Sequence, residues 1–212
     1  MEETKIILVD DHALFRNGLR ELVSMRDGYR IVGEASSGEE FLRLLALTTV
    51  DLVFMDIAMP GMDGAEATRE ALLLQPDLKI ICLSMFGEDI YYSRMVDAGV
   101  KGFLLKDSSI DEVFAAIESV MEGGSYFSPA LMNTVSRSAA ANDESAGEEL
   151  SSREVEVLSG ICQGLSTQEI ADRLFISKRT ADAHRARILE KTGCKNTASL
   201  VVYAIRHGLV DL

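Results

Sequence analysis

Five short apolar runs alternate with five amphipathic stretches in the first 125 residues, and this alternation limits the fold more than any other feature of the chain. The apolar runs are too short for stable helices and are rich in β-branched residues, so they predict buried strands. The amphipathic stretches predict helices. Strands that alternate with helices predict an α/β fold, a (βα)5 doubly wound parallel sheet with helices on both faces. The expected strands are residues 5–9, 29–35, 52–55, 79–83 and 102–105, and the expected helices are 13–25, 38–47, 64–74, 89–98 and 110–121.

The rest of the chain predicts a second, smaller domain. Residues 136–149 are small, polar and acidic, so they bury too little apolar surface to fold alone. From residue 150 onward the pattern is helical throughout, which indicates a small all-α domain of four helices. We therefore predict a first domain over residues 1–127, a linker over 128–148 with a short helix start at 128–131, and a helical domain over 149–212.

Charge is distributed unevenly between these parts. The net charge of −13 is unfavourable for a protein that binds nucleic acid. However, residues 148–212 carry nine Lys/Arg and nine Asp/Glu, whereas the remaining residues carry 12 and 25. Residues 177–195 carry six basic and two acidic side chains. The helical domain can therefore meet phosphate through a local basic stretch, while the first domain is repelled by it.

The sequence also predicts the compartment. No apolar run reaches the roughly 20 residues that a membrane-spanning helix needs, so we expect no membrane partner. The acidic N-terminus has the wrong charge for a secretory signal. Cys82, Cys162 and Cys194 are far apart and fit no zinc spacing, which indicates reduced thiols in a cytoplasmic protein.

Polar side chains stand at the ends of four predicted strands. Asp10 and Asp11 follow the first strand and Asp56 the third, while Ser84 ends the fourth and Lys106 follows the fifth. Such residues converge beyond the carboxyl ends of a parallel sheet. Three neighbouring carboxylates repel one another unless a cation intervenes, and hard oxygen ligands suit Mg²⁺. Mg²⁺ beside a carboxylate nucleophile, with a lysine and a hydroxyl for the equatorial oxygens, predicts transfer of a phosphoryl group onto aspartate.

The sequence around these positions resembles the receiver domain of bacterial two-component systems over residues 4–125. The matching segments are VDDH at 9–12, FMDIAMPGMDG at 54–64, LSMF at 83–86 and KGFLLKD at 101–107. The resemblance implies a phospho-acceptor, Asp56, and two residues that bind phosphoryl oxygens, Ser84 and Lys106. It also implies a Mg²⁺ site formed by Asp11, Asp56 and the backbone carbonyl of Ala58, with Asp10 acting partly through water.

A switch residue is implied at Phe103, where members of that family carry a rotating aromatic side chain that follows Ser84. Taken singly, these residues have plainer interpretations: Asp10 and Asp11 as turn or capping residues, and Phe103 as part of the core. The joint arrangement of five polar residues at strand ends favours the phosphoryl site.

A helix-turn-helix is predicted in the basic stretch. Residues 168–174 form a first helix, residues 176–177 a tight turn, and Ser177 caps a second helix over 178–191. Such a second helix fits the major groove of DNA. Residues 149–210 resemble the LuxR-type domain of the NarL/FixJ class of response regulators, through positions that include Glu154, Gly164, Glu169, Thr180 and His184.

This second resemblance implies the DNA contacts. It places Asp182, Ala183 and Ala186 near base edges. Basic residues suited to phosphates are Lys178, Arg179, Arg185 and Arg187. Several relatives have Lys or Arg where this chain has Asp182 and Ala186. An acid accepts from cytosine but is repelled by phosphate. We therefore expect either fewer direct base contacts or a different DNA sequence, and the departure also leaves room for a weak monomer affinity that needs dimerisation.

Together these features predict a phosphorylation-dependent transcriptional regulator rather than an enzyme with turnover. The resemblance to response regulators implies that a sensor histidine kinase passes phosphate to Asp56, and that a homodimer formed through the helix over 197–206 binds double-stranded promoter DNA. In the unphosphorylated protein, the acidic domain covers the recognition helix or opposes the approach of DNA.

Two rival functions stay open at this point. An aspartyl-phosphate phosphohydrolase uses a second Asp two residues beyond its nucleophile, where this chain has Ala58. A phospho-switched adaptor, whose helical domain binds protein, is favoured by Asp182 and the overall acidity.

Overall fold

The computed structural model describes residues 3–85, 89–127, 150–194 and 196–210. The predicted short helix start at 128–131 and the linker core at 136–149 lie outside the described residues. Within the described residues, no helix is both long and apolar enough to cross a membrane.

A parallel sheet forms the N-terminal domain, with strand order β2-β1-β3-β4-β5-β6. The predicted α/β fold is confirmed. The sixth strand was not expected: it is two residues long, follows α5, and pairs with the edge strand β5. The strands are β1 (Thr4–Val9), β2 (Tyr29–Ala35), β3 (Leu52–Asp56), β4 (Lys79–Ser84), β5 (Gly102–Leu105) and β6 (Tyr126–Phe127).

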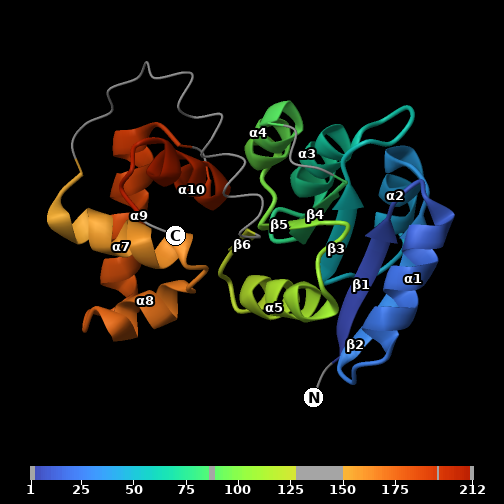
Figure 1. The fold of residues 1–212 in the computed structure, drawn as a ribbon, viewed down its shortest axis with the longest axis horizontal. Helices are drawn as coiled ribbons and strands as arrows, with labels where there is room; N and C mark the ends of the chain where they lie inside the picture. Colours follow the sequence, from blue (N-terminus) through green and yellow to red (C-terminus); the bar gives the residue numbers. More distant parts are fainter. Residues whose placement is uncertain (1–2, 86–88, 128–149, 195, 211–212) are drawn as a thin grey trace.

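Helices cover both faces of the sheet (Figure 1). Strand residues alternate between two apolar clusters, as side chains of period two must. Ile6 and Leu8 pack with α1 and α5, whereas Ile7 and Val9 pack with α2, α3 and α4. The helices are α1 (Ala13–Ser24), α2 (Gly38–Leu45), α3 (Gly64–Leu74), α4 (Asp89–Ala98) and α5 (Ile110–Met121).

Residues 150–194 and 196–210 form four helices, as predicted for the C-terminal domain. They are α7 (Ser152–Cys162), α8 (Thr167–Arg173), α9 (Lys178–Thr192) and α10 (Thr197–Arg206). Each begins at a residue whose side chain accepts a hydrogen bond from a first-turn amide, which explains where the helices start. Gly193 ends α9 in the left-handed conformation. The domain has its own apolar core, which includes Leu158, Ile170, Ile188 and Leu200.

Phe127 connects the two domains. Its ring packs against the α2–α4 side of the sheet domain and also against the core of the helical domain. The helical domain further contacts α4 through α10, so the two domains lie side by side (Figure 1).

The buried carboxylate of Glu154 links α7 to α9. Glu154 is almost fully buried, and its carboxylate accepts hydrogen bonds from Lys191 Nζ (2.8 Å) and from the backbone and hydroxyl of Ser151. The Lys191 ammonium and the Ser151 donors lower the pKa of Glu154 to about 2. Glu154 therefore remains ionised throughout the neutral range and holds the two helices together.

Replacing Glu154 by glutamine should lower the free energy of unfolding by about 2 kcal/mol at neutral pH, since hydrogen bonds to charged groups contribute roughly that much. Because folding lowers the pKa of Glu154 from 4.5 to about 2, its contribution is present above pH 4.5 and is lost as pH falls toward 2. Urea titrations from pH 7 to pH 3 measure the difference. The exposed Glu156 supplies the matched control, and Glu156→Gln should change stability by less than about 0.5 kcal/mol. A pH-independent difference would contradict this role.

Candidate functional site

Three charged side chains meet at the carboxyl ends of the strands. Lys106 Nζ lies 2.7 Å from Asp10 Oδ2 and 3.0 Å from Asp56 Oδ2. All three side chains are at most 5% exposed. The Lys106 amide also donates to the carbonyl of Ser84 (2.7 Å), which fixes the lysine next to the end of β4. The predicted convergence of Asp10, Asp56, Ser84 and Lys106 at one edge of the sheet is thus what the structure shows.

The charges of Asp10, Asp56 and Lys106 do not cancel. Burial, followed by the neighbouring charge of Asp10, raises the pKa of Asp56, and Lys106 only partly opposes this. Burial lowers the pKa of Lys106, but its hydrogen bonds to Asp10 and Asp56 and their charges raise it more, so the ammonium stays protonated. One cation is therefore shared by two buried carboxylates, which leaves excess negative charge at the site.

A metal ion fits this excess charge. Asp10, Asp11, His12 and Asp56 each offer a ligand atom, and these atoms lie within 4.8 Å of one another. Apart from the Lys106 ammonium, no donor among the described residues reaches Asp10 Oδ2 or Asp56 Oδ2. Buried oxygens that lack further donors are the ligands that Mg²⁺ accepts.

The other predicted residues have distinct environments. Ser84 is buried at the end of β4, and Phe103 is buried in β5 within the cluster that includes α4. Ala58 is exposed in the loop after β3.

Sequence reasoning missed the α1 residues that support the site. The Arg16 guanidinium donates to the carbonyl of Asp10 (2.5 Å) and to Glu34 Oε2 (2.9 Å). The Phe15 ring lies 5.0 Å from Lys106 Nζ, a favourable cation–π distance. The sequence signal that could have identified Phe15 and Arg16 is their position in the first turn of the helix that follows Asp10 and Asp11.

Gly64 brings α3 against the strand that carries Asp56. Its amide donates to the carbonyl of Ile57 (3.0 Å), and a Cβ at this position would lie 2.0 Å from the carbonyl oxygen of Asp56. Only glycine permits this approach, so the first turn of α3 fixes the backbone of Asp56.

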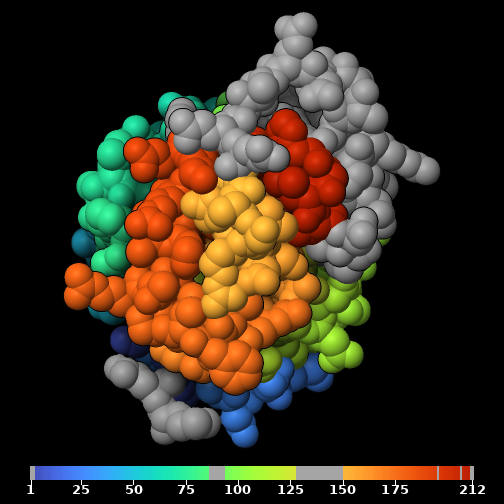
Figure 2. All heavy atoms as spheres, turned by 90° about the vertical axis from the view of Figure 1, so that its left-hand side faces the viewer, coloured from blue at the N-terminus to red at the C-terminus, as the bar shows by residue number. Residues whose placement is uncertain are grey.

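The helix-turn-helix consists of α8 and α9. Ala181 and Ile188 of α9 are buried in the core of the helical domain. Six of the seven residues predicted to contact DNA are exposed. They are Lys178, Arg179, Asp182, Ala183, Ala186 and Arg187. The acidic domain leaves them exposed in this conformation, so of the two expectations, a covered recognition helix or opposition to the approach of DNA, the first is not met here. The helical domain, drawn yellow to red, faces the viewer in Figure 2.

Arg185 is the exception. Its guanidinium donates to Thr197 Oγ1, and the side chain is partly buried between α9 and α10. Burial lowers its pKa, and nearby Asp182 opposes this. In this conformation Arg185 does not point to the surface that the other basic residues form, because it packs toward the start of α10.

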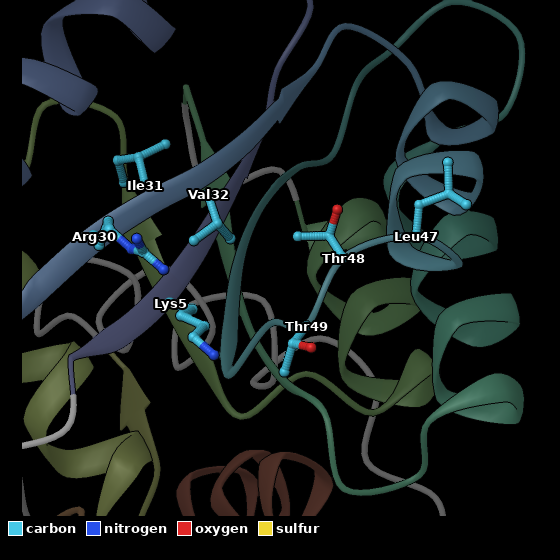
Figure 3. Close-up of a pocket in the computed structure, with 7 residues that line it drawn as sticks. All are labelled: Lys5, Arg30, Ile31, Val32, Leu47, Thr48 and Thr49. Carbon is cyan, nitrogen blue, oxygen red and sulfur yellow. The ribbon is translucent and has the colours of Figure 1, made fainter.

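A pocket of about 410 Å³ lies elsewhere on the sheet domain (Figure 3). Lys5 at the start of β1 and Arg30 at the start of β2 line it, together with Thr48 and Thr49 ahead of β3. These are the amino ends of the strands, so the pocket lies at the opposite edge of the sheet from Asp10 and Asp56. It plays no part in the carboxylate site.

Comparison with known proteins decides the family. Residues 6–118 match the model of the response regulator receiver domain, and residues 148–204 match that of the bacterial regulatory proteins of the luxR family. The chain is a two-component response regulator of the NarL/FixJ class. It is 34% identical to the response regulator GacA of Pseudomonas aeruginosa over 209 residues, which cover 98% of each chain.

Solved structures agree with this assignment. The response regulator ChrA of a heme-sensing two-component system is 30% identical, with a TM-score of 0.56, and the match covers 99% of this chain and 100% of ChrA. A structure of RcsB dimers bound to DNA has a TM-score of 0.60 and covers 95% of this chain and 98% of RcsB; at 23% identity it supports the fold alone. This response regulator therefore has a receiver domain and a LuxR-type DNA-binding domain. Receiver domains bind Mg²⁺ at an acidic pocket, and this chain has an aspartate cluster at the corresponding edge of its sheet.

Proposed function

We propose that this response regulator accepts a phosphoryl group on Asp56 and that the acylphosphate controls promoter binding by α9. The salt-bridged group of Lys106, Asp10 and Asp56 at the carboxyl edge of the sheet is the observation that carries this proposal. The phosphoryl donor is the phosphohistidine of a sensor histidine kinase. An Asp56 oxygen attacks phosphorus, the bond from phosphorus to the donor nitrogen breaks, and the histidine leaves with a proton from solvent.

The buried groups around Asp56 have separate tasks. Asp11, Asp56 and the carbonyl of Ala58 would hold Mg²⁺, with Asp10 acting partly through water. When bound, the ion would supply positive charge to the phosphoryl oxygens. Lys106 already lies within reach of Asp56 and places its ammonium on a second oxygen, and Ser84 donates to a third.

The structural change starts at Ser84. Its hydroxyl moves toward the new phosphoryl group, and Phe103 fills the space that Ser84 leaves. Phe103 lies in the same apolar cluster as Met95 and Val96 of α4, so its rearrangement changes the packing of that helix. The surface formed by α4 and β5 is thus the output of the receiver domain.

The DNA-binding domain inserts α9 into the major groove. Lys178, Arg179 and Arg187 bind phosphates, and Asp182, Ala183 and Ala186 face the base edges. We propose that two copies bind together, a mode that the RcsB dimers on DNA support. We further propose that the two domains span residues 1–127 and 149–212, with a linker between them. The protein acts in the cytoplasm, where the promoter lies.

Phosphoryl labelling of the protein and selection of binding sites from random DNA together test this function. The protein with Mg²⁺ and acetyl phosphate should gain one phosphoryl group per chain, which intact-mass spectrometry detects and peptide mapping places on Asp56. Selection from random DNA should then enrich one sequence, more strongly for the phosphorylated protein. A label elsewhere would overturn the acceptor assignment, and no enriched sequence would favour the adaptor function.

Replacing Lys178 and Arg179 together by alanine should weaken binding to all DNA alike and reduce the slope of log affinity against log salt by about 2. The reason is that each side chain neutralises one phosphate and releases its counterions. Fluorescence anisotropy with cognate and unrelated duplexes at several salt concentrations measures the slope. The charge control is Arg69→Ala on the exposed side of α3, which should leave the slope unchanged. An unchanged slope in the double variant would show that α9 is not the DNA-binding helix.

A further inference from the structure

The amino ends of β1 and β2 carry two cations side by side. Lys5 and Arg30 are directly paired in the register of these parallel strands. Because side chains alternate along a strand, Lys5 lies on the same face of β1 as Ile7. Arg30 lies on the same face of β2 as Val32. Ile7 and Val32 pack in the cluster that contains residues of α2, so both cations extend from the face of the sheet that α2 covers.

The positive charges of this pair are poorly neutralised. Like charges on neighbouring strands repel each other. Arg30 Nε lies 3.5 Å from Glu3 Oε2, and both side chains are 57% exposed, so this surface ion pair contributes little. Among the residues that the structure describes, no carboxylate forms an ion pair with the Lys5 ammonium. Asp51 Oδ2 instead accepts a hydrogen bond from the Lys5 amide (2.8 Å). An anion between Lys5 and Arg30 would therefore remove the repulsion.

Lys5 and Arg30 form one wall of the pocket shown in Figure 3. Its volume of about 410 Å³ is typical of sites for small molecules. Thr48 and Thr49, in the segment between α2 and β3, line the opposite wall. Within the described part of the chain, no hydrogen bond uses the hydroxyl or the amide of either threonine. The pocket thus has two cations on one side and unused hydrogen-bond donors on the other.

An irregularity in β2 lies at the same pocket. The register shifts between Ile6 and Ile7 of β1, so that Val32 is an extra residue of β2 without a partner. Such bulges are rare between parallel strands, and they redirect side chains next to functional sites. Val32 lines the pocket, and so does Leu47, an apolar side chain that is 87% exposed. The pocket therefore combines apolar surface with its two cations.

We propose that this pocket binds a small organic phosphate monoester. The phosphate lies between Lys5 and Arg30, and the organic part contacts Val32 and Leu47. A phosphate monoester carries close to two negative charges at neutral pH, which match the two cations. Its three terminal oxygens accept from the Arg30 guanidinium, the Lys5 ammonium and the threonine hydroxyls. A carboxylate offers only one charge and two oxygens, so it neutralises the pair less well.

This pocket is separate from the carboxylate site. It lies at the amino ends of the strands, whereas Asp10 and Asp56 lie at their carboxyl ends. The carboxylate site has excess negative charge, and the pocket supplies cations of its own. Binding in the pocket is reversible and does not depend on the proposed function, because no residue of the pocket takes part in phosphorylation of Asp56.

Titration of the isotope-labelled full-length protein, followed by nuclear magnetic resonance, tests the proposal. The probes are inorganic phosphate and glycerol phosphate, in EDTA, because carboxylates without Mg²⁺ repel phosphate. The amide signals of Val32, Thr48 and Thr49 should shift and saturate, at a lower concentration of glycerol phosphate than of inorganic phosphate. Glycerol, and sodium chloride at matched ionic strength, should leave these signals in place. No saturable shift, or an equal shift with sodium chloride, would overturn the proposal. Equal affinity for the two probes would mean an adventitious ion only and would overturn it as well.

Two full-length variants locate the binding site. Lys5→Gln and Arg30→Gln each remove one cation and should raise the Kd for glycerol phosphate by about tenfold or more, the loss expected for a charged hydrogen bond. Because each substitution relieves the repulsion, neither variant should melt below wild type at low salt. Lys79→Gln is the matched control, since it removes a cation from the start of β4 outside the pocket, and its Kd should equal that of wild type. An unchanged Kd in Lys5→Gln and Arg30→Gln, or an equal loss in Lys79→Gln, would overturn the proposal.

Discussion

Replacing Asp56 by asparagine should abolish uptake of a phosphoryl group from acetyl phosphate and raise the thermal midpoint of the protein. The carboxylate is the nucleophile, and an amide cannot replace it. The gain in stability follows from the raised pKa of Asp56, because burial and Asp10 make its ionised form unfavourable in the folded state. That cost arises as pH rises from the unfolded value of 3.8 through the higher folded pKa, so the gain should be present near pH 7 and absent below about pH 4.

Intact-mass spectrometry and thermal melts over this pH range measure both effects. The exposed turn residue Asp77 provides a matched control, and Asp77→Asn should label fully and melt as wild type does. Stoichiometric labelling of Asp56→Asn would refute the acceptor assignment. A lower midpoint at pH 7 would instead show that the charge of Asp56 stabilises the fold through Lys106 more than its burial costs.

Replacing Gly64 by alanine should destabilise the receiver domain by about 3 kcal/mol or more and slow phosphorylation sharply. The new Cβ would lie 2.0 Å from the carbonyl oxygen of Asp56 and 3.1 Å from Ile57 Cα, and backbone atoms cannot move aside as a flexible side chain does. The strand end that positions the acceptor must therefore shift. Denaturant titration gives the loss in stability, and the rate of labelling gives the loss of alignment.

Gly18 offers the contrasting substitution. It lies within α1 with open space around it, so Gly18→Ala should stabilise the helix by about 0.5–1 kcal/mol. Equal midpoints for Gly64→Ala and wild type would mean that α3 does not press against the acceptor strand in solution.

The sheet and its carboxylate site could be predicted because both depend on local patterns. Apolar runs of strand length define the sheet. Parallel strands then bring residues such as Asp10, Asp56 and Lys106 to one edge of the sheet, and this does not depend on how the helices are arranged. Strand β6 was not predicted, because its two residues, Tyr126 and Phe127, are too few to show a periodic pattern. They pair only because the β5 edge is available.

Contacts between distant segments could not be predicted in the same way. Glu154 was recognised as part of a motif, but its partner Lys191 is 37 residues away, and only the fold shows that the pair is buried. Arg185 was assigned to the DNA-facing set because its charge suits phosphate. Its position in the sequence does not indicate that α10 packs beside α9, where Thr197 accepts a hydrogen bond from this residue.

The position of Phe127 limits how this protein can be recombined with its relatives. Because one ring completes the packing of both domains, the boundary between them is not a neutral place for a crossover. A chimera that joins this LuxR-type domain to a foreign receiver inherits either a hole in one hydrophobic interior or a misfit in the other, unless position 127 and its neighbours are exchanged as a set. Divergence of the two halves is therefore coupled at this aromatic side chain.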